Sequence, residues 1–366
     1  MEEEIIIIET DEEQEIVIIE NDIEYIEPTT QEKTIEPTTE EQVVVPDDGV
    51  FALSKVMVKR IPESYVEVDG TLDITANGEY DVTDYKKANV NVGGGITKGF
   101  IINECDSNGY VTDASIVGMT SIPDYYLADQ STSSSKLNVF SKKLTNLNLP
   151  SNLTSIGIYA FRYCQNLVLT ELPSTITSIG NYAFAYCKKL ALNKLPNSIT
   201  SIGNYTFQSC ENLPLNELPN GITSIGSSGF DGCKNIALTE LPSGLISMGT
   251  YAFQSCENID IKEIPVGITR LDTGLFIGCT KLTEITCLGD ITSIQAGAIA
   301  CKNLSKFVLP NVTSVPTLGN KSAFNNSLIA SGTGYIYVPD SLVDSFKVAS
   351  NWSTYADQIK GVSELA

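Results

Sequence analysis

The chain of 366 residues contains nine cysteines, one tryptophan and no histidine. The lack of histidine excludes serine and cysteine hydrolases that rely on an imidazole base, and it removes the commonest zinc ligand. The net charge of −22 gathers at the start of the chain, since residues 1–48 hold 18 acidic residues and one lysine. We therefore expect no nucleic-acid partner, no metal and no cofactor.

The first residues, MEEEIIIIETDEEQ, lack the basic start and the apolar core of a secretory signal. No apolar run approaches the roughly 18 residues that a membrane span needs. We expect no membrane insertion and synthesis in a reducing cytoplasm, where cysteines stay free thiols.

Residues 1–48 alternate isoleucine clusters with acidic runs and end in a nine-residue repeat, IEPTTQEKT followed by IEPTTEEQV. The prolines favour extended chain over helix. Two interpretations remain open: a disordered acidic tail, or strands that pair only when docked on a partner or on sister copies. We favour the second, an acidic extended or β anchor that makes the chain a homo-oligomer, with a trimer as one candidate.

Residues 49–95 predict a small β domain. The phrases KVMVKRI and NVNV alternate with period two, and Asn77–Gly78 between LDIT and YDVT is typical of a hairpin turn. The stretch from Thr30 to Val92 resembles segments of virion proteins, of head or tail fibres, in tailed phages that infect Firmicutes. This resemblance implies that residues 1–95 bind capsid or tail proteins of a virion.

Residues 96–143 predict a degenerate first repeat that caps the N-terminal edge of a repeat array and is interrupted by a serine-rich loop. Residues 144–330 form that array and repeat one phrase with a period of 23 residues, which is typical of a solenoid. The copies begin at Ser155, Ser178, Ser201, Ser224, Ser247, Arg270 and Ser293. We predict a mainly β solenoid of about seven repeats with short helical turns.

Each copy carries its own turn signals. A glycine follows the Ser-Ile or Ser-Met pair in five copies, where we expect a left-handed residue between a strand and the YAFxxC turn. These glycines are Gly157, Gly180, Gly203, Gly226 and Gly249. Asp272 can replace glycine in that conformation and Gln295 cannot do so cheaply, so the seventh copy should be distorted. A proline closes the LxxLP strand of each copy.

Two apolar ladders should form the inside of the coil. The cysteine ladder is Cys164, Cys187, Cys210, Cys233, Cys256 and Cys279, and the phenylalanine ladder is Phe161, Phe184, Phe207, Phe230, Phe253 and Phe276. Free cysteine is a small, readily buried residue. Because no second ligand type repeats beside the cysteines, we interpret them as core residues rather than as metal ligands or nucleophiles.

The phrase ITSIGNYAFAYCKKLALNKLP resembles the BspA-like class of bacterial leucine-rich repeats over about residues 144–324. The ending YIYVPDSLVDSFKVASNWSTYADQIKGV resembles the C-terminal cap of such arrays, and we assign residues 331–366 to it. A cap is needed physically, because the last repeat would otherwise expose its apolar edge. The resemblance implies a scaffold for binding or adhesion and no enzymatic activity.

A polar ladder is the main site-like feature, with short polar and charged residues at the same two positions of each copy. Its members are Thr170, Asn193, Asn216, Thr239 and Lys262, beside Glu171, Lys194, Glu217, Glu240 and Glu263. They would suit a glycan or protein surface, yet a solvated strand face needs the same residues. A tyrosine ladder at Tyr159, Tyr182, Tyr205 and Tyr251 is open to the same two interpretations, a sugar platform or packing between repeats.

The sequence favours a non-enzymatic structural protein of a phage virion, made in the host cytoplasm and anchored by its N-terminus. Its repeats would adhere to a glycan or protein of the host surface. The alternative is a leucine-rich repeat adhesin on a bacterial cell surface. A carbohydrate-active enzyme is the third interpretation, but no carboxylate pair stands in a coherent frame, and Asp340 and Asp344 suit a solvated helix.

Overall fold

The computed structural model describes side chains for residues 112–116, 118–124, 126–127 and 143–365, and before them only the backbone of short strands. These strands are β1 (Ile8–Glu9), β2 (Gln14–Glu15), β3 (Val56–Val58), β4 (Thr71–Ile74), β5 (Gly78–Tyr80), β6 (Asn89–Val92) and β7 (Phe100–Cys105), with β8 (Val111–Ile116) running into the described part. The remaining anchor residues and the serine-rich loop lie outside the described residues.

The hairpin predicted at Asn77–Gly78 is wrong. Strand β4 pairs in parallel with β6, and β5 pairs in parallel with β3, so the two strands beside the turn signal belong to different sheets. An Asn-Gly pair favours a reversal of the chain, but it does not decide which strands then pair. Here the NVNV strand, rather than the neighbouring strand, is the partner of TLDI.

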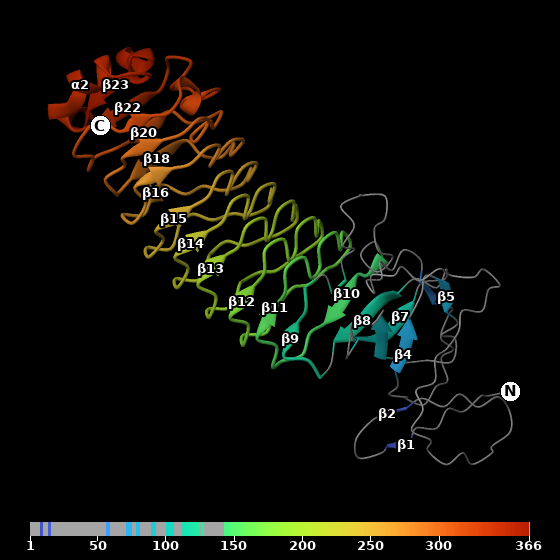
Figure 1. Cartoon of the computed structure of the whole chain (residues 1–366). Helices are drawn as coiled ribbons and strands as arrows, with labels where there is room; N and C mark the ends of the chain where they lie inside the picture. The colour runs from blue at the N-terminus through green and yellow to red at the C-terminus, as the bar shows by residue number, and fades with distance from the viewer. Residues whose placement is uncertain are drawn as a thin grey trace, which may run out of the picture.

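Residues 143–365 wind into an elongated stack of coils, the solenoid predicted from the period (Figure 1). Each coil contributes a two-residue strand to a first ladder, paired in parallel and in register with its neighbours within three short sheets. The strands are β9 (Ser121–Ile122), β11 (Ser155–Ile156), β12 (Ser178–Ile179), β13 (Ser201–Ile202), β14 (Ser224–Ile225), β15 (Ser247–Met248), β17 (Arg270–Leu271), β19 (Ser293–Ile294) and β21 (Thr317–Leu318). Two irregularly spaced rungs, at Ser121 and Thr317, therefore flank the seven regular copies.

A second ladder runs along another side of the coils. Its regular strands are β10 (Asn146–Asn148), β16 (Glu263–Ile264), β18 (Glu284–Cys287), β20 (Lys306–Val308), β22 (Tyr335–Val338) and β23 (Ile359–Gly361). At its start β10 pairs with β8, which is antiparallel to β7, so the solenoid continues the sheet that precedes it. In the middle copies the second ladder is reduced to single backbone hydrogen bonds, such as the one from Ala191 N to Leu169 O at 3.1 Å. At the matching position of the next copy, Pro214 has no N–H to donate.

One contiguous apolar core fills the stack from Ala114 to Ile359. The phenylalanine ladder is completely buried, and its rings stack at centroid distances of 5.3–5.7 Å. Burial of each such ring contributes about 1.5–3 kcal/mol. No single coil encloses its own apolar residues, so the stability of the array comes from contacts between neighbouring coils.

The YAFxxC segment is a run of hydrogen-bonded turns rather than a regular helix. In the coil that starts at Ser178, every second N–H bonds within the turn, as from Cys187 to Phe184 O at 3.0 Å. The others bond to the next coil, as from Tyr182 to Asn204 O at 3.0 Å. Left-handed residues at Tyr182 (φ 58°) and Tyr186 (φ 65°) turn these alternate donors along the solenoid axis. A helix would bond all of them internally.

The predicted left-handed glycines after the Ser-Ile pair are wrong, because none of the five has a positive φ. Glycine is needed there for close packing between coils. A Cβ on Gly180 would lie 2.6 Å from the carbonyl carbon of Gly157 in the preceding coil, closer than carbon atoms approach. The prediction placed the left-handed residue two positions early.

The expected distortion at Gln295 is also misplaced. Gln295 needs no left-handed backbone, and β19 pairs in register on both sides. The irregularity comes six residues later, where the turn is one residue shorter and Cys301 N donates to Ile299 O at 2.9 Å instead of to the residue three back. A deletion in the turn, rather than a residue forced into strain, makes this coil different.

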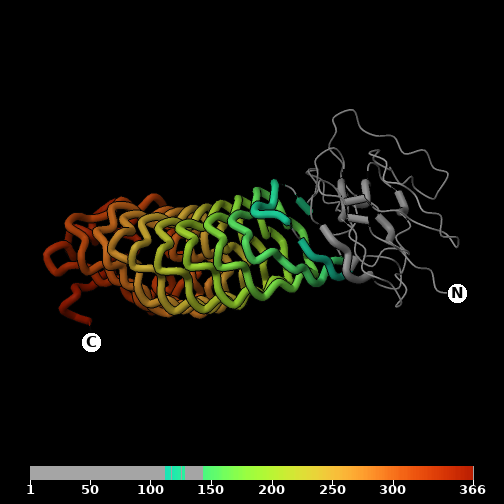
Figure 2. The backbone as a smooth tube through the Cα atoms, turned by 90° about the horizontal axis from the view of Figure 1, so that it is seen from below, coloured from blue at the N-terminus to red at the C-terminus, as the bar shows by residue number. Residues whose placement is uncertain are grey.

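At the C-terminal end of the stack, drawn in red, the chain leaves the repeating coil (Figure 2) and forms short helices. After η2 (Lys321–Phe324) and β22 come η3 (Asp340–Leu342), α2 (Val343–Val348), η4 (Trp352–Gln358), β23 and η5 (Val362–Glu364). Trp352 is buried against Phe324 and Phe346, and its Nε1 donates to Pro316 O at 2.8 Å. In the described part of the chain, no helix is long and apolar enough to cross a membrane.

Candidate binding surface

The turns of successive coils form a surface that we call the turn face, built around two left-handed positions per coil. The first positions are Tyr159, Tyr182, Tyr205, Ser228, Tyr251, Gly274 and Gly297, and the second are Tyr163, Tyr186, Ser209, Gly232, Ser255 and Gly278. Both positions are occupied by tyrosine, serine or glycine, and most of the tyrosines lie in the first three coils. The turn face is therefore aromatic at its N-terminal end and, apart from Tyr251, lined by small residues beyond it.

The tyrosine rings of the first coils stack along the solenoid axis. Tyr182 lies 4.6 Å from Tyr159 and 4.5 Å from Tyr205 between ring centroids, with interplanar angles of 21° and 9°. A second, parallel stack joins Tyr163 and Tyr186 at 4.7 Å. Burial raises the pKa of the Tyr182 and Tyr186 hydroxyls, so both remain neutral donors at neutral pH.

Arg162 lies between the two stacks. Its guanidinium carbon is 5.1 Å from the Tyr159 ring centroid, 4.6 Å from Tyr163 and 5.5 Å from Tyr182, within the range of cation–π attraction. Its Nη2 donates to the Tyr163 hydroxyl at 3.1 Å, while its buried Nε has no hydrogen-bond partner. The aromatic rings are thus the main contact of this planar cation.

The backbone under these tyrosines is strained. A left-handed φ costs a non-glycine residue about 1–2 kcal/mol, and glycine occupies the same positions in later coils without that cost. Ring stacking contributes about 0.5–1.5 kcal/mol per pair, so it offsets the strain without a clear surplus. Each ring is also half-buried, which adds to stability, so the rings serve packing between coils while their exposed parts remain available for contact.

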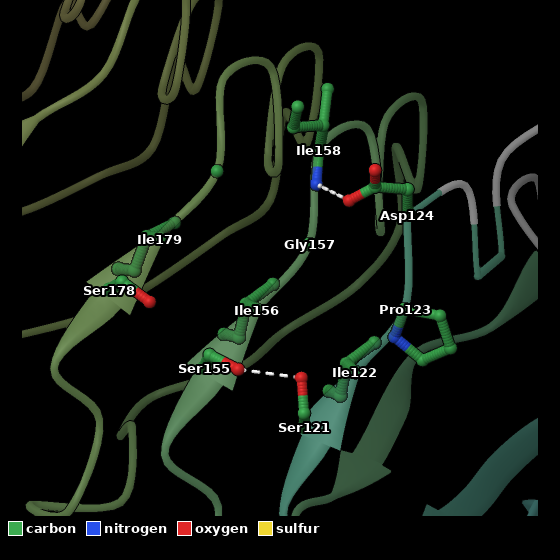
Figure 3. Close-up of a pocket in the computed structure, with 11 residues that line it drawn as sticks. Ser121, Ile122, Pro123, Asp124, Ser155, Ile156, Gly157, Ile158, Ser178 and Ile179 are labelled. Carbon is green, nitrogen blue, oxygen red and sulfur yellow. Dashed lines mark hydrogen bonds between the residues drawn. The ribbon is translucent and has the colours of Figure 1, made fainter.

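The first strand ladder forms a flat polar strip beside the turn face, with two shallow depressions of about 350 and 400 Å³. In the first depression the Ser121 and Ser155 hydroxyls are 2.6 Å apart, and Ile158 N donates to Asp124 Oδ1 at 2.6 Å (Figure 3). In the second, Asn181 and Asn204 each accept a backbone N–H of the next coil at 2.8 Å. The polar side chains here hold neighbouring coils together and leave a surface of hydroxyls and glycines.

The residues of the predicted polar ladder are all exposed on the second ladder, away from the turn face. Successive members are neighbours, since Asn193 N donates to Thr170 O at 3.3 Å. Lys262 lies 2.9 Å from Asp260 and 3.9 Å from Glu284, which is itself 2.6 Å from Lys306. Lys306 lowers the pKa of Glu284 by hydrogen bonding. Ion pairing therefore accounts for Lys262 without a ligand.

The cysteine ladder is completely buried, and its thiols bond to the phenylalanine ladder. From Cys187 onward, each Sγ of the ladder donates to a phenylalanine carbonyl of the preceding coil, as from Cys210 to Phe184 O at 3.1 Å and from Cys233 to Phe207 O at 3.0 Å. Burial raises the pKa of the Cys233 and Cys256 thiols well above the ordinary range. A protonated, inaccessible thiol is neither a nucleophile nor a ready metal ligand.

Among the described residues, no group of three histidine, cysteine, aspartate or glutamate side chains is arranged to hold a metal ion. Asp340 caps a turn of the C-terminal cap, since it accepts from Ser363 N at 3.3 Å and from Ser363 Oγ at 2.8 Å. Asp344 is exposed on α2. Neither carboxylate lines either of the two depressions.

The sequence did not predict the roles of Arg162, Tyr163 and Tyr186 or the left-handed backbone beneath them. A signal was present, because tyrosine, serine and glycine replace one another at the same two positions of successive copies. Such a set indicates a position where glycine is conformationally favoured and tyrosine is retained at a cost.

The parallel strand ladders and the residues repeated from coil to coil define a leucine-rich repeat solenoid. A family model for the BspA type leucine rich repeat region matches residues 134–228 and 214–330. These residues are more than half of the chain, which therefore belongs to the BspA-type leucine-rich repeat family. Proteins of this family are generally binding or scaffold proteins. No curated protein matches the sequence.

Several solved structures are similar to this chain. A leucine-rich repeat protein from Bacteroides ovatus is 25% identical, with 68% of this chain and 60% of that one covered and a TM-score of 0.45. A leucine rich cell surface protein from Faecalibacterium prausnitzii is 19% identical, with 72% of this chain and 92% of that one covered and a TM-score of 0.33. The pneumococcal vaccine antigen PcpA is 14% identical, with 84% of this chain and 82% of that one covered and a TM-score of 0.33. The match thus spans three fifths of the B. ovatus protein.

Proposed function

We propose that the protein is a non-enzymatic adhesin that displays its solenoid on a bacterial cell surface and binds a partner through the turn face. The stacked tyrosines carry this proposal. They are retained at left-handed positions where later coils use glycine, and they surround a cation on the surface rather than fill the core. Large, rigid aromatic side chains that also donate hydrogen bonds are the residues enriched at binding hot spots.

The polar ladder from Thr170 to Lys262, with its charged neighbours, is the second candidate surface for a glycan or protein ligand. Its exposure suits binding as well as solvation. Since the two surfaces lie on different sides of the coil, variants separate them.

The test uses fluorescently labelled full-length protein and cultured epithelial cells. A triple variant, Tyr159→Ser, Tyr182→Ser and Tyr205→Ser, removes the first stack while serine keeps the left-handed backbone that Ser228 already adopts. We expect it to lose at least about tenfold in cell binding, a change of about 1.4 kcal/mol. The control variant carries Thr170→Ala, Asn193→Ala and Asn216→Ala and should bind as the wild type does. The opposite result would transfer the function to the polar ladder, and absence of wild-type binding would contradict adhesion to such cells.

Display on a phage virion is the second proposed function. It is supported by the charge of residues 1–48 and by the resemblance of Thr30 to Val92 to Firmicutes phage virion proteins. In this proposal residues 1–95 attach to capsid or tail proteins, which is a simple use of an acidic segment too short to build a large core of its own. Labelled protein would then bind Firmicutes cells rather than epithelial cells.

The division of the chain at residues 48, 95, 143 and 330 is part of the same proposal. A fragment of residues 96–366 contains the solenoid core and its cap, so it should fold as a monomer. A fragment of residues 1–95 should associate into a homo-oligomer, for which a trimer is the first candidate, or bind virion particles. Decoration of particles by the C-terminal fragment alone would contradict an N-terminal anchor.

A further inference from the structure

The first ladder is interrupted at two of the contacts between coils. Its strands fall into three separate sheets, β9–β11–β12, β13–β14–β15 and β17–β19–β21. One interruption lies between β12 and β13, where the coil that starts at Ser178 meets the coil that starts at Ser201. The other lies between β15 and β17, where the coil that starts at Ser247 meets the coil that starts at Arg270. We call these two contacts the first and the second break.

Backbone hydrogen bonds that join the strands elsewhere are missing at both breaks. In an intact contact the residue after the strand donates to the preceding coil, as from Gly226 N to Ile202 O at 2.8 Å. Within the described coils, the matching N–H groups of Gly203 at the first break and Asp272 at the second make no such bond. The N–H of Thr200, before the strand at the first break, makes none either. The ladder is therefore open at these two places.

The spacing of the coils agrees with the missing bonds. A Cβ on Gly180 or Gly226 would lie 2.6 or 2.8 Å from the carbonyl carbon of a glycine in the preceding coil. A Cβ on Gly203 would meet no backbone atom closer than Asn181 Cα, at 3.5 Å. The rings of the phenylalanine ladder are 5.7 Å apart at both breaks and 5.3–5.6 Å apart at the other three contacts. The strands at the first break therefore stand farther apart than their neighbours do.

On the turn face both breaks are closed. At the first break Tyr182 N donates to Asn204 O at 3.0 Å, and the Tyr182 ring stacks on Tyr205 at 4.5 Å. At the second break Tyr251 N donates to Thr273 O at 2.9 Å. The two coils at each break are thus joined along the turn face and parted along the strands, which is the geometry of a hinge.

An oversized residue stands in the coil that follows each break. The position after the first left-handed residue of each turn is alanine or glycine in five coils and larger in two. Its occupants are Ala160, Ala183, Thr206, Gly229, Ala252, Leu275 and Ala298. The two larger residues, Thr206 and Leu275, belong to the coils that start at Ser201 and Arg270, and both are completely buried.

A side chain at this position presses on the strand of the preceding coil. A Cβ on Gly229 would lie 3.3 Å from Ile202 Cγ2 in the preceding coil. At the first break Thr206 Oγ1 donates to Gly180 O, directly after the preceding strand, at 3.3 Å. Because a close-packed interior has no spare volume, the extra atoms of threonine or leucine hold the two strands apart.

We propose that Thr206 and Leu275 are wedges that give the solenoid two hinges, at the first and the second break. The axis of each hinge runs along the turn face, where backbone bonds hold the coils together, and the strand side opens and closes. Bending therefore leaves the tyrosine stacks continuous and changes the shape of the polar strip, on which the second depression spans the strands between the two breaks. The hinges do not depend on what the protein binds.

The test is hydrogen exchange of single backbone amides in the full-length protein, read by mass spectrometry with fragmentation of the chain. An amide exchanges when it is free of its hydrogen bond, so its rate reports local opening. After correction for intrinsic rates, we expect the Gly203 amide to exchange at least about tenfold faster than the Gly226 amide, and the Asp272 amide at least about tenfold faster than the Gly249 amide. Equal rates within either pair would overturn the hinge at that break.

Thr206→Ala gives the first break the residue of the intact contacts. It should slow exchange of the Gly203 amide at least about tenfold and leave the Asp272 amide unchanged. Ala252→Thr is the converse variant, because it places a wedge at the intact contact between β14 and β15 and should speed exchange of the Gly249 amide at least about tenfold. A Gly203 amide that exchanges at the wild-type rate in Thr206→Ala would show that threonine is not the wedge.

Spin labels measure the bending itself. Thr154→Cys and Ile246→Cys are exposed positions before strands that lie four coils apart, about 19 Å by the strand spacing, with only the first break between them. The labels are attached in a Cys105→Ser background, in which the eight remaining cysteines are buried. We expect Thr206→Ala to narrow the distribution of label distances and Asn193→Ala to leave it as in the parent protein. An equally broad distribution with Thr206→Ala would overturn the hinge even if exchange slowed.

Discussion

Phe207→Ala tests which side of each coil is the core. Phe207 is completely buried, and its ring stacks on Phe184 at 5.7 Å and on Phe230 at 5.5 Å, within 7° of parallel. Truncation of Phe207 deletes a ring that is fully shielded from water. It leaves a cavity between the rings of Phe184 and Phe230, whose coils are held in place by backbone hydrogen bonds. Losses for such changes are about 3–5 kcal/mol. We expect the upper half of this range, because the two neighbouring coils limit collapse into the space.

The assay is equilibrium unfolding in guanidinium chloride, followed by far-ultraviolet circular dichroism. Asn193→Ala is the matched control, since Asn193 is exposed on the second ladder, and it should change the free energy of unfolding by less than about 0.5 kcal/mol. Equal losses for the two variants would show that the assignment of inside and outside is reversed. A local loss confined to one part of the array would appear as a second transition rather than as a smaller shift.

Three further predictions concern the thiols, the glycines and the surface charges. The eight cysteines from Cys164 to Cys301 should react with a thiol reagent only after unfolding. Burial raises the pKa of the seven thiols from Cys187 to Cys301 in the folded state alone, so stability should be unaffected below the ordinary value of 9.0 and fall above it, by about 1.4 kcal/mol per pH unit for each of these thiols. Gly180→Ala should lower the melting temperature through its 2.6 Å approach to the preceding coil, whereas Gly221→Ala, with no atom nearer than 3.7 Å, should leave it unchanged or raise it slightly. Glu211→Gln removes exposed pairs with two lysines, at 3.1 and 3.5 Å, and should cost less than about 1 kcal/mol, a loss that disappears in high salt.

The period of the sequence predicts the fold because a constant repeat length fixes the register. Ser155 pairs with Ser178 and Ile156 with Ile179, as the 23-residue interval alone requires. The cap was also predictable, since the ending that begins YIYV and was assigned to the cap opens with β22. The local backbone conformation was not predictable, because glycine serves two different structural purposes. It relieves strain at left-handed positions, but at Gly180 it makes room for a neighbouring coil that only three-dimensional packing reveals.

The binding surface was less accessible to prediction for a related reason. The tyrosine ladder was visible in the sequence, whereas the position of Arg162 between two stacks depends on the alternation of left- and right-handed residues in the turn. The thiol bonds of the cysteine ladder depend on the same turn, since Phe184 O faces the next coil only in this geometry. The residue type predicted that the cysteines are buried, whereas the backbone geometry determines which carbonyl oxygen accepts each thiol hydrogen bond.

The way in which the cap is attached bears on how such a protein changes over generations. The side chains of Trp352 and Asn351 bond to Pro316 O and Leu318 O, in the last coil of the stack. Duplication or loss of an internal 23-residue unit would therefore leave these contacts at the cap intact and keep each new coil in register. Each added unit would extend the molecule by about 4.8 Å. Reach, and the spacing between the tyrosine stack and the cap, can thus be adjusted by recombination within the gene while the ends of the solenoid stay closed.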